Sequence, residues 1–161
     1  MTTSADFLAR LDAVGERLRQ SAAESPGGAT APDGVTGETW EVTQVWAHMA
    51  EFIPYWIEQA DHVVSRWCGE PIPFGRTKKD PIRVAAIAAG RGQSVEASWA
   101  AVEVGITQLH VWITRLEATS WNVVGQHETM GSMPLPRIVD EFLVGHLDEH
   151  LAQLDELRAH G

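Results

Sequence analysis

Several features of common protein classes are scarce in this sequence. It has one cysteine in 161 residues, which excludes an intrachain disulfide framework and a zinc site built from cysteines. Lys and Arg number 12 against 22 Asp and Glu, and the resulting net charge of −10 argues against nucleic acid or an anionic membrane as partner. No apolar run approaches the roughly 20 residues of a membrane span. The first residues lack the features of a secretory signal, so we expect a cytoplasmic protein.

Strand patterns are scarce as well. Only residues 121–124 have strand-like composition, and one short strand cannot form a sheet. Apolar residues instead recur at spacings of three and four, which is typical of amphipathic helices. The predicted helices cover roughly 4–24, 41–68, 93–118 and 135–159. We therefore predict a single all-α domain over residues 1–161, an up-down four-helix bundle with long loops.

Smaller features refine this helix pattern. Thr3 or Ser4 is the expected cap of the first helix, and Pro54 predicts a kink or a break in the second. A shorter helical pattern begins at Pro81 and is interrupted at residues 90–92 by two glycines.

Histidine and tryptophan are abundant, with seven of each, and the histidines are the candidates for chemistry. His146 and His150 are four residues apart, which places two imidazoles about 6 Å apart on one helix face, near enough to share a metal ion. Chance alone gives about 0.3 such pairs in this composition, so the spacing is weak evidence by itself.

The position of this pair strengthens the case, because both histidines continue the apolar row of Val139 and Leu143. Two buried imidazoles cost several kcal/mol in unmet hydrogen bonds unless something satisfies them. A metal ion would do so, and the alternative is hydrogen bonding to neighbouring side chains or water.

His48 is the candidate third ligand. It lies on the second predicted helix between the apolar residues Val45 and Phe52, and is expected to point inward. Taken alone, it would more often be a hydrogen-bonded core residue. Opposite the pair on the last helix, it completes three nitrogen ligands and leaves positions open for water or substrate, which is typical of a catalytic rather than a structural site.

The other histidines are weaker candidates. His62 is about 21 Å along the same helix from His48, so the two cannot bind one ion. His110, on the third predicted long helix, is a reserve ligand, whereas His127 and His160 are expected at the surface. Glu51 and Glu149 are candidates for orienting the imidazoles, with simple solvation as the alternative.

Other catalytic motifs are missing. Leu147 follows His146, so there is no HExxH protease motif, and the paired Glu-x-x-His pattern of di-iron carboxylate proteins is absent too. Cys68 is expected to be a small apolar residue rather than a nucleophile, and the tryptophans are expected in the core. No catalytic residue is assigned beyond Glu51 as a candidate general base.

Trp40-x5-Trp46-x-His48, followed by a late His146-x3-His150, resembles the DinB-like superfamily. Within it, the chain is most similar to the N-terminal domain of mycothiol-dependent maleylpyruvate isomerases, in which a Trp also stands eight residues before the metal histidine. The resemblance implies a four-helix bundle that binds zinc or nickel through His48, His146 and His150. It also implies thiol S-transfer or isomerisation with mycothiol, bacillithiol or a glutathione-like cofactor. The second domain of those isomerases has no counterpart in this sequence, which separates the metal domain from the specific isomerase activity.

The leading hypothesis is therefore a metal-dependent thiol transferase or isomerase-like enzyme. Three neutral imidazoles leave the charge of the ion in place, so a bound thiol would lose its proton near neutral pH and attack an electrophilic partner. A metal-dependent hydrolase is the nearest alternative. A non-catalytic metal or small-ligand binding module, in one version a homodimer, is the alternative from another class, and a metal-free structural bundle is the third.

Overall fold

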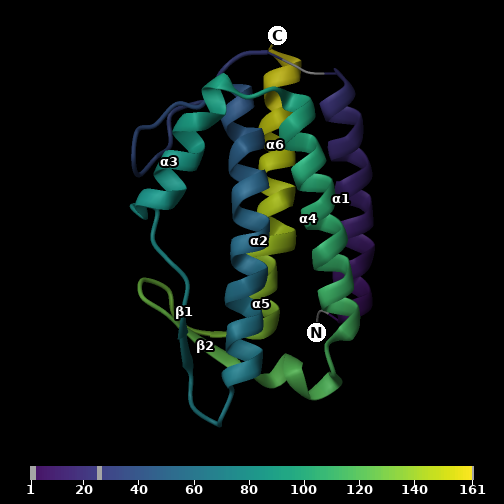
Figure 1. Cartoon of the computed structure of the whole chain (residues 1–161), viewed down its shortest axis with the longest axis vertical. Helices are drawn as coiled ribbons and strands as arrows, with labels where there is room; N and C mark the ends of the chain where they lie inside the picture. Colours follow the sequence, from purple (N-terminus) through teal and green to yellow (C-terminus); the bar gives the residue numbers. More distant parts are fainter. Residues whose placement is uncertain (1–2, 25–26, 161) are drawn as a thin grey trace.

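The computed structural model of the chain describes residues 3–24 and 27–160, and four long helices dominate it (Figure 1). The α-helices are α1 (Ser4–Glu24), α2 (Val42–Arg66), α3 (Pro81–Ala89), α4 (Val95–Arg115), α5 (Leu135–Val139) and α6 (Gly145–Ala159). A π-helical turn, Asp140–Val144, joins α5 to α6, and two short 3-10 helices cover Gly90–Gly92 and Ala118–Asn122. Three short strands are β1 (Ile72–Phe74), β2 (Val124–His127) and β3 (Gly131–Pro134).

The long helices form a ring in which α1 and α2 are each flanked by α4 and α6. The apolar stripes predicted from the sequence meet in the middle of this ring. The largest fully buried side chains come from α1, α2, α4 and the β3–α5 segment that precedes α6. They include Phe7, Leu11, Trp46, Phe52, Ile53, Leu109, Ile113, Met133 and Ile138. The predicted four-helix bundle is confirmed. No helix in the described part of the chain is long and apolar enough to cross a membrane.

The ends and interruptions of the first two helices follow local chemistry. Thr3 Oγ1 accepts a hydrogen bond from the backbone N–H of Asp6 at 3.2 Å, and the Asp6 carboxylate accepts one in return from Thr3 N–H at 2.8 Å. This reciprocal capping confirms the cap expected at Thr3. Of the kink or break predicted at Pro54, the break does not occur: α2 continues through that residue as one helix.

The last long helix contains an irregularity that the sequence analysis did not predict. Its π-helical turn at Asp140–Val144 adds about one residue to a helical turn and rotates everything beyond it relative to α5. Gly145 follows directly, and a Cβ atom there would lie 2.4 Å from the carbonyl oxygen of Asp140. The tight turn therefore requires glycine at this position.

A small sheet lies beside α2, so the prediction that no sheet forms was wrong (Figure 1). β1 pairs with β2 in parallel, with Ile72 opposite Gly125, and β2 pairs with β3 as an antiparallel hairpin, with Val124 opposite Pro134. The strands are only three or four residues long and contain glycine and proline. They are held by packing: a Cβ atom at Gly125 would lie 2.6 Å from the ring of Phe74. Such strands carry no alternating pattern that a sequence analysis could recognise.

Candidate metal centre

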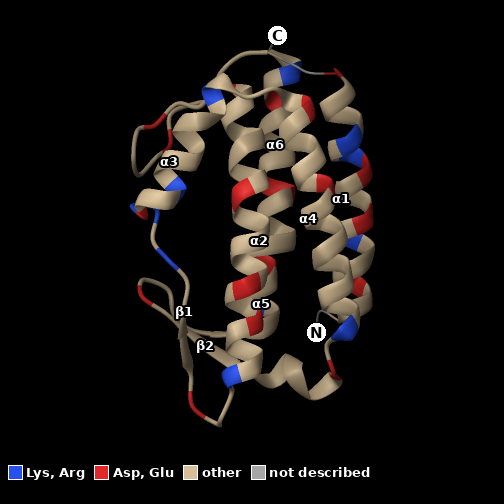
Figure 2. Ribbon diagram, in the orientation of Figure 1, with Lys and Arg blue, Asp and Glu red and all other residues tan. Residues whose placement is uncertain are grey.

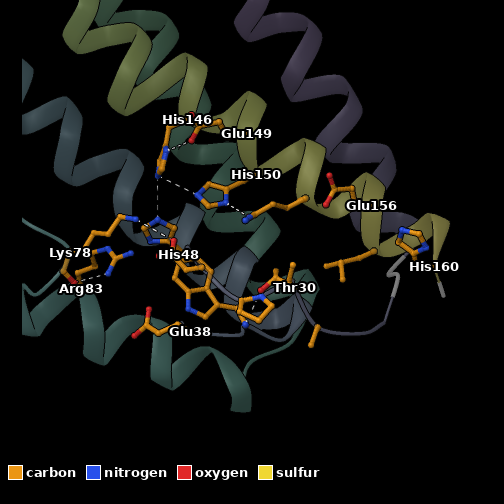
Figure 3. A pocket seen from close by; sticks show the side chains of 17 residues that line it. Thr30, Glu38, His48, Lys78, Arg83, His146, Glu149, His150, Glu156 and His160 are labelled. Atoms are coloured by element: carbon orange, nitrogen blue, oxygen red, sulfur yellow. Dashed lines mark hydrogen bonds and ion pairs between the residues drawn. The ribbon is translucent and has the colours of Figure 1, made fainter. Parts of the chain in front are cut away.

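The structure brings the three predicted histidines together inside the bundle. His48 comes from α2, and His146 and His150 come from successive turns of α6. The Nε2 atom of His146 lies 3.4 Å from Nε2 of His48 and 3.2 Å from Nε2 of His150 (Figure 3). In the described part of the chain this is the one group of three or more potential ligands whose atoms all lie within 4.8 Å of one another.

These distances fit a shared metal ion. Nitrogen ligands about 2.0–2.1 Å from one tetrahedral zinc ion are about 3.3 Å from each other. The two nitrogen separations in the cluster, 3.2 and 3.4 Å, match that value. Three Nε2 atoms facing one another also cannot satisfy each other, since neutral imidazoles whose Nδ1 is the donor present only lone pairs at Nε2. The residues present therefore fit a divalent cation.

Each imidazole has a polar group near its other nitrogen. Glu149 Oε2 lies 3.1 Å from Nδ1 of His146, and Gln153 Oε1 lies 2.7 Å from Nδ1 of His150. Glu51 Oε2 lies 3.8 Å from Nδ1 of His48, which is too long for a hydrogen bond. An acceptor at Nδ1 keeps the proton there and frees Nε2 to bind a metal. The structure thus places Glu149 beside His146, leaves Glu51 beyond hydrogen-bonding distance of His48, and places Gln153, which the sequence analysis missed, beside His150.

Aromatic rings enclose the histidine cluster. The Trp40 ring centroid is 5.1 Å from that of His48 and 6.3 Å from that of His150. On the other side Phe52 is 4.6 Å from His146 and 5.1 Å from His48. Trp40, eight residues before His48, therefore packs against two of the three imidazoles and excludes water from them.

Burial keeps two of the imidazoles neutral. Desolvation lowers the pKa of His150 to about 3, with the charge of His146 as the next cause. Desolvation also lowers the pKa of His48 well below its ordinary value, followed by the charges of His150 and His146. At neutral pH both side chains therefore present the uncharged form that a metal ion requires.

This burial predicts an acid-sensitive stability in chelator-treated protein. The folded state holds His150 neutral, whereas the unfolded chain protonates it below its ordinary pKa of 6.5. Stability from this group is thus complete above pH 6.5 and is lost as the pH falls, by about 2 kcal/mol between pH 7 and 5. Urea unfolding at the two pH values measures it, and His150→Leu should flatten the dependence. An unchanged slope in that variant would contradict the assignment.

A largely buried ion pair between Arg76 and Glu51 of α2 lies next to His48. The side chain of Arg76, after β1, is 7% exposed and forms a close ion pair with Glu51, which is 15% exposed. The guanidinium also lies 3.8 Å from the ring centroid of Tyr55 and 3.5 Å from a carboxylate oxygen of Asp80. Arg76 thereby fixes the carboxylate that lies closest to Nδ1 of His48.

Removing one partner of this pair should be costly. Arg76→Met leaves the Glu51 carboxylate buried without its cation, and we expect the free energy of unfolding to fall by about 3 kcal/mol. Chemical denaturation measures the change. The matched control is Arg91→Met at an exposed arginine, expected within about 0.5 kcal/mol of wild type. The double variant Arg76→Met/Glu51→Met should recover most of the loss, and failure to do so would show that the pair is not the cause.

The remaining histidines lie outside the cluster. His160 is exposed, as expected, and His62 is exposed as well. His110, the reserve ligand, faces α1, where its Nε2 lies 3.7 Å from the Asp12 carboxylate, so it is not part of the centre.

His127 was expected at the surface, and that prediction was wrong. Its exposure is 3%, its Nε2 lies 3.2 Å from the carbonyl oxygen of Arg76, and its Nδ1 accepts hydrogen bonds from the backbone N–H groups of Thr129 and Met130 at 3.3 Å. The residue fell in a segment interpreted as a loop because the strand β2 was not recognised.

Two further predictions concern Cys68 and the tryptophans. Cys68, expected to be a small apolar residue rather than a nucleophile, is exposed. Trp46 and Trp56 are buried as predicted, whereas Trp67, at 36% exposure, lies at the surface.

A cavity of about 490 Å³ opens onto the three histidines. Its wall comes from α6, the segment before α2, and the connection between β1 and α3 (Figure 3). Lys78 and Arg83 lie at one end beside His48, and Glu156 and His160 lie at the other. The volume suits a small organic molecule that reaches the metal centre.

Comparisons with known proteins identify the fold. One solved structure aligns over 98% of this chain and 86% of its own length, with a TM-score of 0.75 and 18% sequence identity. It is YfiT from Bacillus subtilis, described as "a probable metal-dependent hydrolase with an unusual four-helix bundle topology". This chain has the YfiT fold. No protein-family model and no curated protein sequence matches the chain. At this identity the similarity to YfiT concerns the fold alone, a four-helix bundle.

Proposed function

We propose that the chain is a metal-dependent enzyme of the DinB-like type that activates a low-molecular-weight thiol for S-transfer or isomerisation. The observation that carries this proposal is the convergence of three Nε2 atoms, from His48, His146 and His150, at a cavity of about 490 Å³. The metal ligands, the preference for zinc or nickel and the mycothiol-like cofactor are all part of the proposal.

A divalent cation bound there would supply positive charge that lowers the pKa of a thiol or water bound to it. The residues of the chain orient the imidazoles and exclude water from them. Glu149 and Gln153 hold the Nδ1 protons of His146 and His150, and so keep their Nε2 atoms free. Trp40 and Phe52 exclude water from the imidazoles.

The thiol itself has to come from a bound molecule. Cys68 is the single cysteine of the chain, and it is exposed and does not line the cavity. A small thiol and an electrophile are therefore the proposed partners. A cytoplasmic location, a single domain and the absence of a nucleic-acid or membrane partner stay predictions from the sequence.

A metal-dependent hydrolase is the second candidate. The observation that favours it is the shared fold with YfiT, which is described as a probable metal-dependent hydrolase. In that case water takes the place of the thiol at the same three histidines. A non-catalytic binding module, monomeric or dimeric, remains the alternative from another class.

One set of assays separates these functions. Purified protein is incubated with a chlorinated dinitrobenzene and a panel of small thiols, and in parallel with 4-nitrophenyl acetate without thiol. The proposal predicts thiol-dependent turnover that is lost in His48→Ala and retained in His62→Ala, whose histidine is exposed on the same helix. Turnover of the ester alone would favour the hydrolase, and no turnover with a full complement of metal would favour the binding module.

A further inference from the structure

We infer that the end of the cavity formed by Arg83 and Lys78 binds the carboxylate of an anionic small molecule whose other end lies against the three histidines. That this molecule is a substrate rests on the proposed function. That its carboxylate binds here is argued from the side chains of the cavity alone.

The first observation is an arginine without an acidic partner. Arg83, in the first turn of α3, lines the cavity, and in the described part of the chain no carboxylate oxygen lies within 4.0 Å of it. Its Nη1 donates a hydrogen bond to the carbonyl oxygen of Lys78 at 2.8 Å. The buried Arg76, by contrast, has two carboxylates. Desolvation by the surrounding protein lowers the pKa of Arg83, which shows that the cation is held away from water.

An anion in the cavity can accept the hydrogen bonds that this partly buried guanidinium does not give to Lys78. One carboxylate can accept two parallel hydrogen bonds from a guanidinium, and the planar fork of arginine matches that geometry. Arg83 also lies 5.8 Å from the ring centroid of Trp40, the residue that packs on His48 and His150. The arginine, the aromatic ring and the metal centre therefore share one cavity.

The charge around Arg83 indicates a monoanion. Lys78 is close by, but its Nζ lies 3.2 Å from the carboxylate of Asp33, so that charge is already matched. The charge of Glu38, which also lines the cavity, acts on Arg83 without a direct ion pair. The positive charge left at this end is therefore at most about one, which suits a carboxylate better than a dianionic phosphate. The connection between β1 and α3 carries basic residues on its ribbon, whereas acidic residues predominate along the helices of the bundle (Figure 2).

The arrangement of charged side chains along the cavity predicts the orientation of the bound molecule. Lys78 and Arg83 lie beside His48, while Glu156 and His160 are at the far end (Figure 3). A molecule with its carboxylate at Arg83 would thus place the adjacent atoms at the histidines and leave the far end for an uncharged or basic group. The substrate class that follows is a small carboxylate-bearing compound.

The test uses two probes that differ only in charge, 3,5-dinitrobenzoate and 3,5-dinitrobenzamide. Both absorb tryptophan emission, so binding next to Trp40 quenches fluorescence, and calorimetry provides an independent measurement. Titrations are done at pH 8 on protein as purified and after chelation. We expect the acid to bind wild-type protein roughly 10- to 100-fold more tightly than the amide, the range for hydrogen bonds to a charged group.

Variants then assign the preference to Arg83. In Arg83→Gln the affinities for the two probes should differ by no more than about threefold. Arg83→Lys should retain part of the preference, because it keeps the charge without the planar guanidinium. Lys79→Gln, at an exposed neighbour outside the cavity, should behave as wild type. Circular dichroism shows whether each variant is folded. If Arg83→Gln does not fold, the inference is tested by comparing the preference for the acid over the amide in Arg83→Lys with that in wild-type protein.

The outcomes separate this inference from the proposed function. Equal affinities in the wild type, or a preference that survives in Arg83→Gln, would overturn it. A preference that disappears on chelation would mean that the acid binds the metal instead of Arg83, which also overturns it and leaves the proposed function in place. A preference that persists in protein shown to bind no metal would support the carboxylate site and refute the proposed function.

Discussion

Protein purified without a histidine tag should contain close to one equivalent of a divalent metal, and His146→Ala should contain almost none. His146 is the middle histidine of the cluster, with its Nε2 3.4 Å from that of His48 and 3.2 Å from that of His150. Its removal leaves two imidazoles that no longer surround a common point. Loss of a group that only orients a ligand costs about 10- to 100-fold in metal affinity, so loss of the ligand itself should cost more than about 100-fold. Elemental analysis after gel filtration, together with competition against a chromophoric chelator, measures both quantities.

Two other histidines provide the controls for that result. His62→Ala and His110→Ala remove imidazoles that lie outside the cluster, one exposed on α2 and one facing Asp12, and should leave the metal content unchanged. Substoichiometric metal in wild-type protein, or a content unaffected by His146→Ala, would refute every metal-dependent function discussed above.

The second large effect is expected at Gly145, where Ala should both destabilise the protein and weaken metal binding. The added Cβ would lie 2.4 Å from the Asp140 carbonyl oxygen, a backbone atom of the π-helical turn that cannot move aside alone. Overpacking of this kind costs about 3 kcal/mol. If the chain relieves the clash by converting the π turn to an α turn, α6 rotates and carries His146 and His150 away from His48. Thermal unfolding and metal titration measure the two consequences.

Gly92→Ala is the matched control, since an added Cβ there meets no atom within 4 Å. It should change the free energy of unfolding by less than about 0.5 kcal/mol and leave metal affinity unchanged. A Gly145→Ala protein as stable as wild type, with full metal affinity, would show that the π turn does not position the two histidines.

The helices and their ends could be predicted from the sequence because each rests on local chemistry: apolar residues at helical spacing, the reciprocal cap of Thr3 and Asp6, and the glycines of Gly90–Gly92. The π turn also left a trace. Leu135, Val139, Leu143 and Leu147 are all buried at a uniform spacing of four, which exceeds the 3.6 residues of an α-helical turn. The sheet left none, because its short strands are stabilised by contacts such as Gly125 against Phe74.

The residues of the site likewise divide into those that could be predicted from the sequence and those that could not. His48, His146 and His150 were recognised because a histidine in an apolar stripe is conspicuous, and the structure brings all three together. Arg76 and Arg83 were missed, since an arginine in a loop or at the start of a short helix is indistinguishable in sequence from a solvated one. Their roles depend on the burial of one against Glu51 and the placement of the other in the cavity, which are tertiary facts.

The central claim is that three imidazoles hold one metal ion, and X-ray absorption spectroscopy of the purified protein tests it most directly. The account predicts an edge from a divalent transition metal, zinc or nickel, and three imidazole nitrogens at about 2.0–2.1 Å, with the imidazole scattering reduced by one third in His48→Ala. A spectrum with sulfur ligands, or one with oxygen ligands alone and unchanged by His48→Ala, would contradict it.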